Sequence, residues 1–157
     1  MRWIAVPLVG LFFVTACGPS AEDRAAAEAE AQAEREDSLL QASQTAYEPA
    51  VFDTLTWESP EARMARGAQV WNFSCSKCHG PTGLGDGGFV MAGDTLRPPS
   101  FQDPEWALAG DTMAIRKAIF VGTGEGMPHW GLEGLKAEAV EAVTYHILEG
   151  FPVTSGG

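Results

Sequence analysis

The chain has 157 residues, about one domain's worth, and 45% of them are hydrophobic. Its formal net charge is −11, and residues 17–60 hold ten acidic residues against only two arginines. This charge argues against nucleic-acid binding, because phosphate contacts require clustered lysines and arginines.

Residues 1–16 have the form of a secretory signal peptide. Arg2 supplies a positive charge, and an uncharged run from Trp3 to Ala16 follows it. This run is short for a membrane span, which needs about 20 residues. It ends in Val-Thr-Ala-Cys17, which resembles the lipobox of bacterial lipoproteins. The resemblance implies that Cys17 is lipidated and begins the mature chain; the alternative is ordinary cleavage, with Cys17 incidental or lost.

Residues 17–59 are predicted to form an acidic tether rich in alanine and glutamate. From Ser20 to Leu40 the sequence contains good helix formers without glycine or proline, and Ser20 with Asp23 suits a helix cap. It lacks a sustained apolar stripe, so we expect either a solvated helical spacer or a disordered segment. Residues 45–59 are too apolar for a free linker, and they are expected to pack on the domain or on a partner.

Residues 60–157 form the predicted domain, which begins with a helix from Pro60 to Phe73. Proline is tolerated near a helix start, and apolar residues recur at helical spacing. Gly67 and Trp71 stand four residues apart and therefore lie on one side of this helix.

The helix leads into Cys75-Ser-Lys-Cys78-His79, the spacing that attaches c-type haem. Each thiol adds to one haem vinyl group, and the histidine then lies under the ring as the proximal iron ligand. A dithiol pair, a zinc site and a disulfide are the alternatives. A redox dithiol pair would be expected close to a βαβ pattern. A zinc site would need His129 and His146 as further ligands. The sequence therefore predicts one covalent haem c, held by Cys75, Cys78 and His79.

A loop region rich in glycine and proline runs from Gly80 to Trp106. Several of its glycines, including Gly83, Gly85 and Gly87, suggest positive φ angles or close backbone approach. Arg97 precedes two prolines and is a candidate partner for a haem propionate; the alternative is a surface arginine.

Two helices are predicted after this loop, at residues 110–122 and 135–149. Asp111 suits the first helix as a cap, and Gly122 suits its end. Tyr145, in the last helix, is the aromatic residue expected to meet the helix that contains Gly67.

The iron's second axial position has several candidate ligands. Met64 and Met113 lie at apolar helical spacing and are interpreted as core residues, and His129 and His146 as ordinary surface or helix residues. Met127 follows a glycine-rich stretch, and Pro128 stiffens the turn after it. Met127 is therefore favoured, with Met91, His129 and an open site as alternatives.

Residues 60–152 resemble class I cytochromes c in three separated features: the haem motif, the Gly-Met-Pro loop and a helix at each end. The resemblance implies an all-α fold in which the N- and C-terminal helices cross at a glycine. It also implies Met127 as the distal axial ligand.

The predicted function is that of a one-electron carrier, because a haem with both axial positions filled cannot bind substrate. The protein would not itself be an enzyme. Its expected partners are redox proteins, among them a membrane-bound respiratory or photosynthetic complex. It would be held by lipid on the periplasmic side of a bacterial cell envelope. The alternative function is a haem enzyme subunit or gas sensor with an open or displaceable sixth site.

Overall fold

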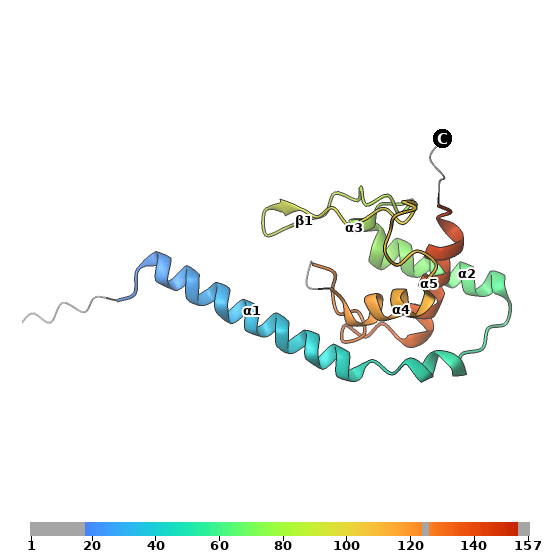
Figure 1. Cartoon of the computed structure of the whole chain (residues 1–157), viewed down its shortest axis with the longest axis horizontal. Coiled ribbons are helices and arrows are strands. Elements are labelled where there is room, and N and C mark those ends of the chain that lie inside the picture. Colours follow the sequence, from blue (N-terminus) through green and yellow to red (C-terminus); the bar gives the residue numbers. More distant parts are fainter. Residues whose placement is uncertain (1–17, 124–125, 154–157) are drawn as a thin grey trace, which may run out of the picture. The chain divides into compact units, whose positions relative to one another are not determined.

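The computed structural model describes residues 18–123 and 126–153 (Figure 1). The chain falls into two compact units, Met1–Glu34 and Arg35–Gly157. The predicted signal peptide and Cys17 lie outside the described residues. Among the helices that are described, none is both long enough and apolar enough to cross a membrane.

Helix α1 (Ala21–Ala46) begins in the first unit. Ser20 Oγ donates to Asp23 Oδ2 at 2.7 Å and accepts from the Asp23 amide at 3.1 Å. This reciprocal pair satisfies amide groups at the helix start, as the predicted cap requires. Of the two readings of residues 20–40, the helical one is confirmed.

The second unit is mostly helical, which confirms the predicted all-α class. A short antiparallel hairpin, which was not predicted, interrupts the loop after the haem motif. After α1 the elements are η1 (Pro49–Thr54), α2 (Pro60–Val70), η2 (Trp71–Cys75), α3 (Ser76–His79), β1 (Val90–Met91), β2 (Asp94–Thr95), α4 (Thr112–Val121) and α5 (Ala137–Gly150).

Helices α2 and α5 cross at a glycine (Figure 1). A Cβ atom built on Gly67 would lie 2.7 Å from the Cβ of His146 and closer still to the carbonyl oxygen of Ala142. Real Cβ atoms do not approach other atoms so closely, so only glycine permits this crossing. Tyr145 contacts α2 as expected: the central carbon of the Arg63 guanidinium lies 3.3 Å from the centroid of the Tyr145 ring.

The helix that begins at Pro60 is longer than predicted. Ser59 caps it by accepting from the Ala62 amide at 3.1 Å. The prediction ended this helix at Phe73, but helical structure continues through the π-helical turn η2 and through α3 to His79. Single π-helical turns occur mostly within longer helices, and local sequence patterns do not reveal them.

The tether's end packs on the domain. Ser43 is fully buried, and Phe52 is 5% exposed within the core. The ring of Tyr47 lies 6.0 Å from that of Phe52, between centroids, and Leu55 packs against the same core. Tyr47, Phe52 and Leu55 therefore have their partners in this chain, whereas Val51 is exposed.

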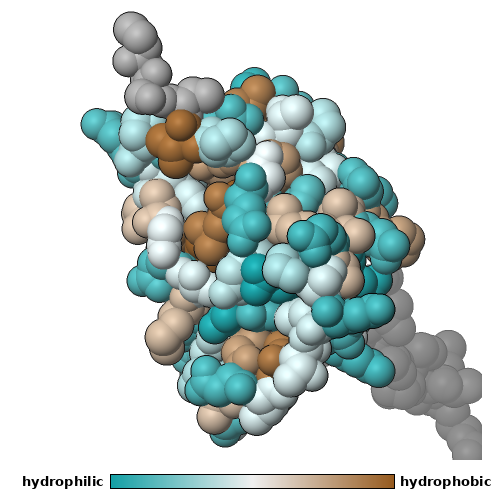
Figure 2. Space-filling model, turned by 90° about the vertical axis from the view of Figure 1, so that its right-hand side faces the viewer, coloured by the Kyte–Doolittle hydropathy of each residue, from teal (hydrophilic) through white to brown (hydrophobic). Residues whose placement is uncertain are grey.

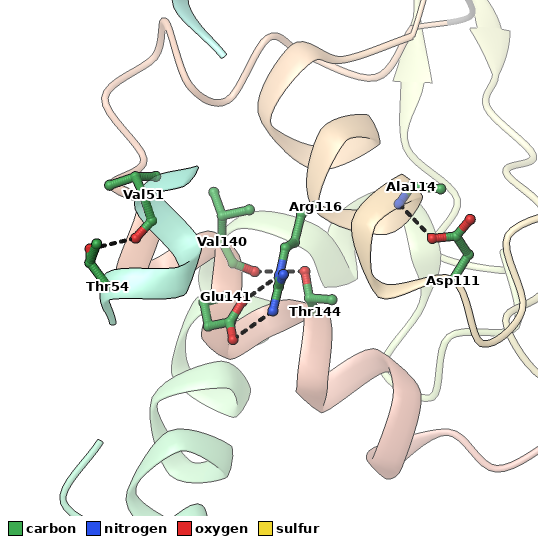
Figure 3. Close-up of polar contacts among 8 residues, drawn as sticks. All are labelled: Val51, Thr54, Asp111, Ala114, Arg116, Val140, Glu141 and Thr144. Atoms are coloured by element: carbon green, nitrogen blue, oxygen red, sulfur yellow. Dashed lines mark hydrogen bonds and ion pairs between the residues drawn. The ribbon is translucent and has the colours of Figure 1, made fainter. Parts of the chain in front are cut away.

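Helix α4 has the predicted ends. Asp111 accepts from the Ala114 amide at 2.9 Å, and Gly122 follows the last residue with a φ of 81°. The interpretation of Met113 as a core residue is wrong, because its side chain is 63% exposed. About one helical turn after Met113, Arg116 Nη2 donates to Glu141 Oε1 of α5 at 2.8 Å (Figure 3).

The hydrophobic core lies between the helices of the second unit. Figure 2 shows one face of the molecule, on which hydrophobic residues are interspersed with hydrophilic ones rather than gathered in one patch. The buried core residues are Phe52, Val70, Trp71, Phe101, Ile115, Ile119, Ala139, Val140, Val143, Ile147 and Phe151.

Candidate functional site

Cys75, Cys78 and His79 lie together where η2 passes into α3. Because α3 is a single helical turn, both sulfurs and the imidazole project from one short stretch of backbone. Both thiols are free and partly exposed. The glycine-rich loop packs directly on this turn, since a Cβ on Gly87 would lie 2.7 Å from the carbonyl carbon of Cys78. The predicted glycine role is therefore confirmed at Gly87, while Gly83 and Gly85 have positive φ angles of 75° and 79°.

The imidazole of His79 is held by aromatic packing. Its centroid lies 4.8 Å from that of Phe101 with an interplanar angle of 23°, and 5.9 Å from that of Trp71. Its Nδ1 is buried and has no hydrogen-bond partner among the residues that the structure describes. Burial lowers the pKa of His79 from 6.5 to about 4. The ring is therefore neutral at ordinary pH, which is the form that binds a metal.

The two thiols differ in their surroundings. Burial, together with the neighbouring Cys78, raises the pKa of Cys75 to about 12. Burial also raises the pKa of Cys78, although the charge of Lys77 opposes the shift. Both groups therefore stay protonated at neutral pH, and neither has the lowered pKa that marks a reactive dithiol pair. Thioether attachment to haem requires two free thiols, and Cys75 and Cys78 provide them in one helical turn.

Met127 lies partly buried against the same hydrophobic core as Cys75. Its carbonyl oxygen accepts from the Thr123 amide at 3.3 Å, which closes the turn around it. Met91 approaches the same turn from the hairpin, because a Cβ on Gly126 would lie 2.8 Å from the Met91 methyl carbon. Two thioethers therefore lie near this turn, and Met91 is the more exposed of the two.

Arg97 and His129 differ in their exposure to solvent. Arg97 is exposed, and within residues 18–123 and 126–153 no acidic group pairs with it. His129 is not the surface residue expected, because its side chain is only 12% exposed. Its Nδ1 lies against the Val121 carbonyl oxygen, and its Nε2 lies 3.9 Å from Glu36 Oε2.

His146 packs against aromatic residues rather than lying free on the helix surface. Its ring lies 6.0 Å from that of Trp71, and its edge meets Phe151 at 5.1 Å, between centroids.

In the part of the chain that the structure describes, no three side chains of His, Cys, Asp or Glu gather to hold a metal ion. The zinc alternative, which needed His129 and His146, finds no ligand set there.

Phe101, which stacks on the candidate iron ligand His79, was not predicted as a site residue. A single aromatic residue after two prolines, in a loop without periodicity, gives no pattern that could identify it. Trp71 was placed on the correct helix side, but its contacts with His79 and Phe101 (5.8 Å) follow only from the fold.

Comparison with known proteins identifies the family. Residues 62–147 match the family model described as cytochrome c oxidase, cbb3-type, subunit III. The chain belongs to this family. It is therefore a mono-haem c-type cytochrome domain, and its cofactor is one covalently bound haem c.

A curated relative is the cbb3-type cytochrome c oxidase subunit FixP of Azorhizobium caulinodans. It is 29% identical over 90 residues, which cover 57% of this chain. The chain spans only about a quarter of that relative's length, 27%. No solved structure matches the chain.

Proposed function

We propose that this protein is a membrane-held cytochrome that passes single electrons between redox partners, as part of a respiratory oxidase complex or beside one. The supporting relative is itself named as an oxidase subunit. The observation that carries the proposal is geometric: His79 is stacked on Phe101 and directly follows a helical turn with two free thiols, Cys75 and Cys78. Haem c supplies the one-electron chemistry through the ferric and ferrous states of its iron.

Each residue of the site has a distinct role in this proposal. Cys75 and Cys78 would form the thioether bonds, and His79 would bind the iron. Met127 would be the second iron ligand, and it packs against the same core as Cys75. A thioether in that position raises the reduction potential and keeps small ligands away from the metal. The exposed Arg97 is the proposed contact for a propionate.

The proposed location is the periplasmic side of a bacterial cell envelope. Lipid on Cys17 would anchor the chain, and acyl chains stabilise membrane attachment in proportion to their buried methylene groups. Residues 17–59 form the proposed tether, and α1, within it, would act as a spacer. A tether raises the effective concentration of the domain near its membrane partners.

The assignment of the distal ligand is tested by replacing Met91 and Met127, the two thioethers near this turn. The full-length chain is made with haem attached, and the absorption band from sulfur to ferric iron is recorded. We expect Met91→Leu to retain this band and Met91→Leu/Met127→Leu to lose it. The Met91→Leu background prevents Met91 from replacing the missing ligand, as its place beside Gly126 would allow. A band that survives in the double variant would contradict the assignment.

The same preparation tests the role in electron transfer. Ferrous protein with both axial positions filled should bind carbon monoxide weakly, whereas an open sixth site would bind it readily.

Copurification with an oxidase from detergent-solubilised membranes tests the proposed partner. A Cys17→Ala variant that stays in the membrane fraction would argue against the lipid anchor.

A further inference from the structure

The end of the tether helix packs on the chain segment that leads to Met127. Ser43, on α1, is fully buried, and its Oγ donates to the carbonyl oxygen of Phe120 at 3.2 Å. One turn later, the ring of Tyr47 lies 5.5 Å from that of Phe120, between centroids. Phe120 therefore contacts the tether through both its backbone and its side chain.

Phe120 in turn holds the segment that contains Met127, residues 126–131. The carbonyl oxygen that accepts from Ser43 also accepts from the Gly131 amide at 2.9 Å. The ring of Phe120 covers Gly131, since a Cβ there would lie 2.6 Å from its Cδ1. A second contact runs from Glu36, on α1, to His129 of the same segment at 3.9 Å.

We propose that Ser43 and Tyr47 are positioning residues for the distal ligand. They fix Phe120, Phe120 fixes residues 126–131, and the thioether of Met127 is thereby held at the iron. The tether would then link membrane attachment to the haem, because the helix that leads toward the anchor ends on this contact. The inference rests on the proposed role of Met127 as distal ligand.

The test measures how readily the thioether leaves the iron. Imidazole is added to the ferric full-length holoprotein; the sulfur–iron bond breaks, a nitrogen–iron bond forms, and no electron is transferred. We expect Ser43→Ala to accelerate this exchange about fivefold, the factor that corresponds to one ordinary hydrogen bond. Tyr47→Leu should accelerate it as well, and it provides a second variant if Ser43→Ala does not fold.

Two controls separate positioning from general stability. Thr45→Ala removes an exposed hydroxyl on the same helix, which bonds only the Gln41 carbonyl oxygen at 2.8 Å, and should not change the rate. Ile147→Val removes one methyl group from the core and should lower the unfolding temperature, but it should accelerate the exchange less than Ser43→Ala does.

The outcomes distinguish this inference from the function on which it rests. An unchanged rate in both Ser43→Ala and Tyr47→Leu would overturn the positioning role, and so would an equal acceleration in Ile147→Val. If instead the sulfur-to-iron band persists in Met91→Leu/Met127→Leu, the assignment of Met127 itself fails.

Discussion

Gly67 of α2 lies directly against the backbone of Ala142 in α5. A methyl group on Gly67 would also lie 2.7 Å from the Cβ of His146, so neither helix could keep its position. The helix that begins at Pro60 continues to His79, and α5 packs along it. This crossing therefore supports the part of the chain that carries the haem motif.

We predict that Gly67→Ala destabilises the holoprotein. Alanine is a better helix former by about 1 kcal/mol, so its local effect should be stabilising. The clash with Ala142 should outweigh this gain, since overpacking in a close-packed interior costs about 1–3 kcal/mol. Urea unfolding should show a lower midpoint. Ala65→Gly, at an exposed position of α2, gives the size of the helix-propensity effect alone.

The pair of Arg116 and Glu141 joins α4 to α5 (Figure 3). Glu141 is 5% exposed, and the Arg116 guanidinium carbon also lies 5.1 Å from the ring centroid of Phe52. We predict that Arg116→Met lowers the free energy of unfolding by about 3–5 kcal/mol, because it leaves a buried carboxylate without its partner.

The matched control for this pair is Arg116→Met/Glu141→Leu. Two apolar residues of similar volume can replace a buried ion pair with little loss, so the double variant should recover most of the stability. Chemical unfolding of the two single variants and the double variant measures the coupling. Additive losses would show that the two charges do not stabilise the fold together.

The sequence was sufficient to predict where α4 and α5 lie, because caps and periodicity are local properties. Asp111 and Gly122 bound α4 as their residue types suggest. The exposure of Met113 follows from the helical period, because Met113 lies two positions before the buried Ile115 and so on the opposite side of α4. The continuation of the first helix to His79 depends on a π-helical turn, which has no simple sequence pattern.

The proposed haem-binding residues stand out in the sequence for a different reason: covalent attachment demands a fixed spacing of cysteine and histidine. The long-range contacts around them could not be predicted. Phe101 reaches His79 from 22 positions later in the chain, and Ser43 reaches Phe120 across 77 positions. Such contacts depend on how the loops fold back, and a serine in a polar helix looks like any surface residue.

We predict that His146 makes stability depend on pH. Burial lowers its pKa below the ordinary value of 6.5, and its Nδ1 is buried without a partner among the described residues. The unfolded chain takes up a proton as the pH falls through 6.5, whereas the folded chain does so only at lower pH. This contribution is therefore fully present above pH 6.5 and is lost as the pH falls below it.

His146→Phe tests this dependence while it keeps a ring against Trp71 and Phe151. Unfolding of the holoprotein is measured from pH 7.5 to about pH 5; in that form the proposed iron ligation of His79 would remove its own titration. We expect the variant to lose less stability than the wild type over this range. Equal slopes for the two proteins would show that His146 does not contribute.

The ring of Phe120 lies directly against Gly131. A methyl group on Gly131 would lie 2.6 Å from the Phe120 ring, and Gly131 is not among the glycines with positive φ angles. Gly131→Ala should therefore disturb the fold by its volume alone, at a cost of about 1–3 kcal/mol. Phe120→Leu/Gly131→Ala makes room for the methyl group, so it should unfold at a higher urea concentration than the sum of the single effects implies. If the two losses simply add, the ring and the glycine are not in contact, and the link from Phe120 to residues 126–131 is reduced to one backbone hydrogen bond.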